Sequence, residues 1–168
     1  DAGLAVHDLL DAPDGLRWIA HAHGLQAWRG DDKVYDFNVD NSALPAVSAQ
    51  RLALRRVAGS HELYAATGHG LARWTPADGL EHVTDLPDLA PGVRVHDFSV
   101  LPDPARPEVD RLWIATDGGL VLRDAYAWTR IDGGCLAGIG PFTVDAEPRA
   151  NGARLWLAAR GGLWRIDP

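Results

Sequence analysis

Cysteine and methionine are almost missing from this chain. Cys135 is the only cysteine among 168 residues, and there is no methionine. A single cysteine excludes a disulfide within the chain and a zinc site with two or more cysteine ligands. Because methionine is absent, we expect that a leader or an upstream domain has been removed, or that the chain is a piece of a longer one.

Long apolar runs, lysine and helical patterns are also scarce. No apolar stretch approaches the roughly 18 residues that a membrane span needs, and the start has no signal-peptide pattern. The net charge of −7 argues against general nucleic-acid binding and gives no attraction to an anionic membrane. Proline and glycine interrupt the chain throughout, as all-β folds require.

What the sequence does contain is a repeat. Four segments align without gaps, and in each an aromatic residue is followed six positions later by Gly-Leu. The aromatic residues are Trp18, Tyr64, Trp113 and Trp156, which are 46, 49 and 43 residues apart. Strand-rich repeats of about 40–50 residues are typical of β-propeller blades.

The third copy shows why each unit should form a hairpin. Residues 112–116 are nearly all apolar, which predicts a strand that is buried on both faces. We expect residues 117–119 to form a three-residue loop that ends in glycine, because its last position favours a positive φ. Residues 120–123 then return as an antiparallel strand.

Further strands are expected on both sides of each hairpin. Inner strands precede the four hairpins, over residues 5–10, 52–57, 93–100 and 142–146. More polar outer strands follow three of them, over residues 33–39, 80–84 and 127–131. The blades therefore cover approximately residues 4–41, 50–88, 93–133 and 139–168, in a single β-propeller domain or propeller segment.

The fourth copy has no outer strand. It ends at residues 164–168, so its sheet has an open edge of the kind that proteins normally protect. Three alternatives stay open: a larger propeller, a second subunit that covers the edge, or a closed four-bladed ring. The predicted fold is all-β, a β-propeller of four antiparallel repeats whose last blade lacks its outer strand and is part of a larger propeller or completed by a partner.

Residues 95–132 resemble the two-component regulator propeller repeat. The family's motif stands here as LWIATDGGL over residues 112–120, with Ala115 in place of the usual glycine. The resemblance implies a sensor part of a histidine kinase that is often extracytoplasmic and binds small ligands or sugars. Apart from this resemblance, the localisation is unknown.

Histidines are the first candidates for ligand binding. His21 and His23 flank the first hairpin loop, and His69 takes the position of His23 in the second copy. Three imidazoles from neighbouring loops could face one ligand or metal ion. The alternative is that they are solvated or hydrogen-bonded loop residues.

The dipeptides His7-Asp8 and His96-Asp97 are the second candidates. They begin the inner strands of the first and third copies, so they could form a polar ligand site at the mouth of the central channel. A carboxylate beside an imidazole could also serve acid–base chemistry. The alternative is that these side chains bond to the backbone of neighbouring blades and fix the blade spacing.

Tryptophan is abundant and more typical of the core than of a binding surface. We expect Trp18, Trp113 and Trp156 at blade interfaces, and Trp28, Trp74 and Trp164 to be mostly packed. Trp128, on an outer strand, is the best candidate for an exposed aromatic side chain at an interface. No nucleophile elbow, P-loop, HExxH or EF-hand spacing is present.

Three functions are compatible with these observations. The first is a non-catalytic binding or sensor module that recognises a small molecule, such as a sugar, or a protein partner within a larger assembly. It needs no cofactor, no metal and no catalytic residue. The second is a metal-assisted propeller lyase or hydrolase that uses the histidine cluster. The third is a structural assembly subunit that docks by its open sheet edge.

Overall fold

The computed structural model describes residues 4–87, 89, 92–131, 140–149 and 152–167. Across these residues the chain forms four antiparallel sheets and no helix. The predicted all-β class with four repeats is therefore confirmed. We refer to the sheets as blades 1 to 4.

The strands of each blade lie side by side in chain order. Blade 1 contains β1 (Val6–Asp11), β2 (Arg17–His21), β3 (Gly24–Arg29) and β4 (Asp32–Phe37). Blade 2 contains β5 (Ala49–Val57), β6 (Ser60–Thr67), β7 (Gly70–Thr75) and β8 (Gly79–Val83). Blade 3 contains β9 (Val95–Asp103), β10 (Arg106–Thr116), β11 (Gly119–Arg123) and β12 (Trp128–Ile131). Blade 4 contains β13 (Pro141–Arg149), β14 (Gly152–Ala159) and β15 (Gly162–Ile166), and no outer strand among the described residues.

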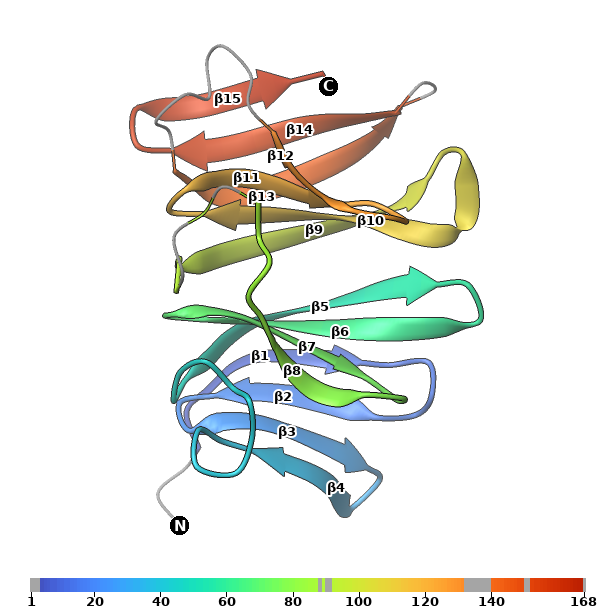
Figure 1. Ribbon diagram of the computed structural model, residues 1–168, viewed down its shortest axis with the longest axis vertical. Helices are drawn as coiled ribbons and strands as arrows, with labels where there is room; N and C mark the ends of the chain where they lie inside the picture. The colour runs from blue at the N-terminus through green and yellow to red at the C-terminus, as the bar shows by residue number, and fades with distance from the viewer. Residues whose placement is uncertain (1–3, 88, 90–91, 132–139, 150–151, 168) are drawn as a thin grey trace.

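The blades stack along the long axis of the molecule, with blade 1 at one end and blade 4 at the other (Figure 1). Extensive contacts join consecutive blades, mainly through the inner strands β1, β5, β9 and β13. A closed four-bladed ring would require blades 1 and 4 to pack against each other. That alternative is wrong, because the two blades lie at opposite ends of an open stack (Figure 1).

Blades 2, 3 and 4 each cover the aromatic face of the blade before them with an apolar face of their own, which in blade 2 includes Trp74. Side chains alternate between the two faces of a strand, so both faces of a sandwiched strand must be apolar. The shared cores contain Trp18 with Leu63 and Ala65, Tyr64 with Leu112 and Ile114, and Trp113 with Leu155 and Leu157. Trp18 and Tyr64 are 0% exposed, and Trp113 is 2% exposed.

The hairpin loops are shorter than the sequence predicts. Thr116 pairs directly with Gly119, so the loop has two residues and not three. Gly119 has a φ of +129°, which is the positive value expected for glycine at this position. At Gly24 a side chain is also excluded sterically, because a Cβ there would lie 2.1 Å from the carbonyl oxygen of Phe37.

Two tryptophans differ from expectation. Trp128 is half-buried, and its ring meets that of Tyr64 edge-on with centroids 5.9 Å apart. It is therefore not an exposed aromatic side chain, because β12 lies over the junction of blades 2 and 3. Trp156 is only half-buried, because no blade covers its face among the described residues.

Leu120 and Leu163 provide a matched test of this packing, because each follows the glycine of its hairpin. Leu120 is 1% exposed and Leu163 is 69% exposed. We expect Leu120→Ala to lower the free energy of unfolding by about 2–5 kcal/mol through cavity formation. Leu163→Ala should change it by less than about 0.5 kcal/mol. Urea denaturation followed by tryptophan fluorescence measures both, and equal costs would contradict the open stack.

Candidate ligand-binding face

The residues singled out from the sequence all lie at one end of the blades. Antiparallel pairing places the start of an inner strand beside the hairpin loop of the same blade: Val6 pairs with His21, and Val95 with Thr116. We call this end, formed by the β2–β3, β6–β7 and β10–β11 loops and the starts of β1, β5 and β9, the loop end.

The inner-strand carboxylates bond to the next blade. The backbone N–H of Leu52 donates to Asp8 Oδ2 over 2.8 Å, and the N–H of Val144 donates to Asp97 Oδ2 over 3.2 Å. The hydroxyl of Thr143 also donates to Asp97. Each aspartate therefore joins its strand to the inner strand of the following blade, a geometry that fixes blade spacing.

The inner-strand histidines have partners as well. His7 Nδ1 donates to the carbonyl oxygen of Ala49 in blade 2 over 2.8 Å. His96 Nε2 lies 2.6 Å from Asp117 Oδ1, in the hairpin loop of its own blade. The two dipeptides do not meet at one site, because they belong to blades 1 and 3.

The hairpin histidines are also separated. His21 is 2% exposed, and its Nδ1 accepts a hydrogen bond from the backbone N–H of His23 over 3.1 Å. The side chains of His23 and His69 are exposed. Within the described part of the chain, no group of three or more His, Cys, Asp or Glu side chains could hold a metal ion.

Burial lowers the pKa of His21, because charging the imidazole would require its desolvation. Asp36 opposes this shift, whereas His23, His7 and Lys33 add to it. His21 is therefore neutral in the folded chain near neutral pH.

A hollow with a cavity volume of about 120 Å³ lies at the loop end between blades 2 and 3, and the sequence did not predict it. Leu86 and Leu89, between β8 and β9, form one wall. Leu89 also lies close to the β10–β11 loop, because a Cβ on Gly118 would be 2.4 Å from Leu89 Cδ2. The lining is mostly apolar. It consists of Gly70, His82, Val83, Thr84, Leu86, Leu89, Gly92 and Val93.

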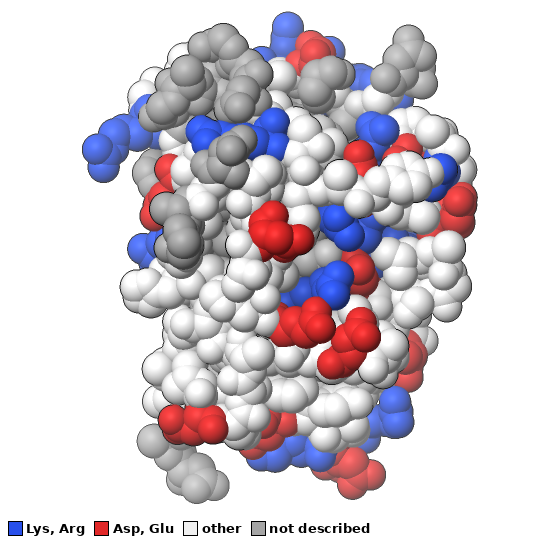
Figure 2. All heavy atoms as spheres, viewed as in Figure 1, with Lys and Arg blue, Asp and Glu red and all other residues white. Residues whose placement is uncertain are grey.

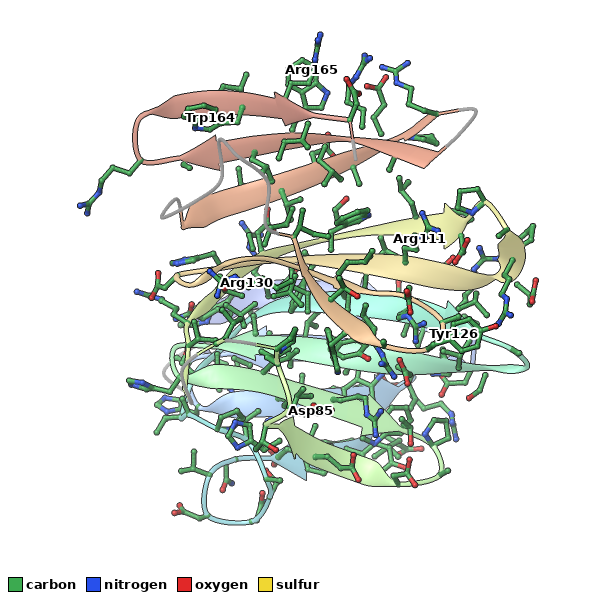
Figure 3. The ribbon with its side chains drawn as sticks, turned by 45° about the horizontal axis from the view of Figure 1, so that its top comes forward. Asp85, Arg111, Tyr126, Arg130, Trp164 and Arg165 are labelled. Atoms are coloured by element: carbon green, nitrogen blue, oxygen red, sulfur yellow. The ribbon has the colours of Figure 1, made fainter. Side chains whose placement is uncertain are left out.

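A second, charged hollow with a cavity volume of about 170 Å³ adjoins the first. His82, Val83 and Thr84 line both. Figure 2 shows acidic and basic side chains together in the middle of the face that is viewed in Figure 1, and Figure 3 shows Asp85 on the connection after β8. The other residues that line the charged hollow are Arg73, Glu81, Asp85, Arg123 and Trp128.

Two arginines that line this second hollow interact with other side chains of the protein. Arg73 donates to Glu81 over 2.8 Å, and the guanidinium of Arg123 lies 5.2 Å from the ring centre of Trp128. The two hollows share the residues at the end of β8. A ligand in the apolar hollow would therefore lie close to the charged side chains of the second hollow.

Asp97 tests the spacing role of the inner-strand carboxylates. Asp97→Ala leaves two donors of blade 4 without this acceptor, so we expect a loss of about 1–3 kcal/mol in the free energy of unfolding. Asp97→Asn keeps an acceptor oxygen and should recover most of that loss. Urea denaturation measures both variants, and an unchanged stability of Asp97→Ala would exclude the spacing role.

His21 should make stability depend on pH. In the unfolded chain histidine takes up a proton near its ordinary pKa of about 6.5, whereas its pKa in the folded chain is lower. As the pH falls through about 6.5, the unfolded chain binds more protons, so the free energy of unfolding decreases.

We expect His21→Gln to reduce this dependence, and His23→Gln, which changes an exposed side chain, to keep it. Urea denaturation between about pH 7.5 and 5.5 makes the comparison. The assignment fails if both variants retain the slope of the parent chain.

No helix among the described residues has the length and apolar character needed to cross a membrane. No family model matches this chain, and no curated protein matches it in sequence.

Several solved structures resemble the fold. Two crystal structures of BBS1N in complex with ARL6DN match at TM-scores of 0.64 and 0.63, with 17% and 14% sequence identity. The match covers 98% of this chain and 50% and 54% of theirs, so this chain spans about half their length. The extracellular domain of the putative one component system BT4673 from B. thetaiotaomicron matches at a TM-score of 0.49 and 16% identity, over 98% of this chain and 27% of its own. The four successive antiparallel sheets and the BBS1N structures together show that the chain has a β-propeller fold.

Proposed function

We propose that this chain is a non-catalytic sensor or binding module of a larger assembly, and that it holds a small molecule at its loop end. The observation that carries the proposal is the hollow between blades 2 and 3, with a cavity volume of about 120 Å³. Ligand sites are typically concave and apolar with a few polar groups, and a hollow of this volume suits a compact ligand.

The lining favours a compact ligand with an apolar body. Leu86, Leu89 and Val93 supply apolar surface, and His82 and Thr84 supply polar atoms at the boundary with the charged hollow. A sugar would need more hydrogen-bond partners than this lining offers. An apolar ring or short chain that carries one polar group fits it better.

The histidines of the neighbouring loops are proposed as further contacts. The carbonyl oxygen of His69 lies 3.7 Å from the position that a Cβ on Gly92 would take, so its loop borders the hollow. Neither histidine is itself a lining residue, but His69 precedes the lining residue Gly70, whereas the loop of His23 in blade 1 contributes no lining residue. We therefore assign ligand contact to the loop of His69 before that of His23.

A role within an assembly is supported by the resemblance of residues 95–132 to the two-component regulator propeller repeat. That resemblance also supports an extracytoplasmic sensor. BBS1N, which shares the fold, is in complex with the protein ARL6DN, and we propose that a protein partner also contacts this chain. We assign no catalytic residue.

Ligand-observed NMR with small apolar probes tests the hollow. Indole, phenol and benzoate should give saturation transfer from the protein, and Thr84→Trp should abolish it by filling the mouth of the hollow. Thr84 is exposed, so the substitution should leave folding intact.

Thr129→Trp is the matched control, because Thr129 is exposed on β12 and is not part of the lining. The expected result is loss of transfer in the first variant and retention in the second. Saturation transfer that persists in Thr84→Trp would contradict a ligand site in this hollow. So would the absence of saturation transfer to all three probes with the parent chain.

A further inference from the structure

The outward face of blade 4 carries the interface residues of the repeat with nothing covering them. Leu163 is 69% exposed, whereas its counterparts Leu25, Leu71 and Leu120 are 0%, 0% and 1% exposed. These four leucines follow the hairpin glycine and occupy the same register in their sheets. In three blades this position is buried by the next blade along the stack.

Trp156 lies on the same face and repeats the pattern. It has the register of Trp18, Tyr64 and Trp113, whose side chains are at most 2% exposed. Trp156 itself is only half-buried. The face therefore offers the tryptophan and the leucine that an adjacent blade normally covers.

An arginine on this face does not prevent such packing. Arg165 points away from the stack (Figure 3), and it pairs with Trp156 in the sheet register. Arg73 has the equivalent register in blade 2, where it pairs with Tyr64. There it lies at the junction with blade 3 and is neutralised by Glu81 over 2.8 Å.

The outward face of blade 1, at the other end of the stack, is different. Arg17 stands where blades 2, 3 and 4 have leucine, at positions 63, 112 and 155. It forms a bidentate ion pair with Asp11, with N–O distances of 2.7 and 3.1 Å. Gln26 donates to Asp36 and accepts from the indole N–H of Trp28. This face satisfies its polar groups by itself.

The polar network excludes a second copy as the best occupant of blade 4. Head-to-tail stacking would place Arg17 and Asp11 on Trp156 and Leu163, and would desolvate an ion pair without new partners. The outward face of blade 4 carries one ion pair of its own, Arg154–Asp167 over 2.8 Å, which any covering blade would desolvate. An apolar face such as that of blade 2, with Leu63, Ala65 and Trp74, adds no second ion pair to this cost, and it already covers Trp18.

We infer that the outward face of blade 4 docks one further blade of a larger propeller, whose contacting side is apolar. The inference rests on the larger assembly of the proposed function, but not on the ligand hollow. The BBS1N chains, about half of whose length this chain matches, show that a propeller of this fold can be longer.

Thiol labelling of the extended chain tests the docking. In a Cys135→Ser background, Leu163→Cys reports on the face of blade 4, and Leu9→Cys, at a site that is 51% exposed, reports on blade 1. In one extended chain, a second copy of residues 30–84 follows Asp167. The copied β4 then supplies the outer strand of blade 4, and a copy of blade 2 follows it. In a second extended chain, a copy of residues 76–131 follows Asp167. The copied β8 supplies the outer strand of blade 4, and a copy of blade 3 follows it. The reagent is 5,5′-dithiobis(2-nitrobenzoate).

We expect labelling at position 163 to be fast in the parent chain and at least tenfold slower in an extended chain. Labelling at position 9 should be equally fast in both. Unchanged labelling at position 163 in both extended chains would overturn the inference, whether the added blade is folded or not.

Labelling at position 163 that slows as the concentration of the parent chain rises would also overturn it, in favour of a second copy. Fragment binding in the hollow between blades 2 and 3 is measured separately. The inference and the ligand proposal can therefore fail independently.

Discussion

The constraint on which this structure depends is that blades 2 and 3 each have two apolar faces and cannot bury both alone. Burial of apolar surface contributes about 25 cal/mol per Å², so the sheets stack face to face, with the aromatic side of one on an apolar side of the next. Arg55 is a charged side chain inside this stack, and it is 1% exposed. It bonds to Glu62 in blade 2 and to the carbonyl oxygens of Asp110 and Asp124 in blade 3, so a buried cation joins two blades without being left unpaired.

The sequence was sufficient to predict the hairpins because their signals are local. The aromatic residue and the glycine six positions later define two strands and their turn, and both were found close to the predicted residues. The loop length was wrong by one residue, because it depends on whether Thr116 and Gly119 close the ladder. The surroundings of Trp156 and Trp128 could not be derived, because they depend on which blade or strand lies across from them.

The candidate site was less accessible to sequence reasoning. Asp8 and Asp97 were correctly placed at the starts of inner strands, but only coordinates show that they accept hydrogen bonds from the next blade. The burial of His21 and the hollow beside His82 arise from how loops pack between blades. The only sequence signal for the hollow is the presence of Leu86, Leu89 and Val93 in a connection that would otherwise be polar. A ligand-binding role of the seven predicted residues stays a prediction.

Native-state amide hydrogen exchange tests the stacking of the blades most directly, because the central strands β6, β10 and β14 each have hydrogen-bonded neighbours on both sides. These strands differ in how many faces of their sheet another blade covers. Blades 2 and 3 are packed on both faces, and blade 4 is packed on one (Figure 1). Local opening is easier where fewer apolar contacts must be broken. We therefore predict slow exchange in β6 and β10 and exchange at least tenfold faster in β14. Equal protection of all three strands would contradict an open stack held together by face-to-face burial.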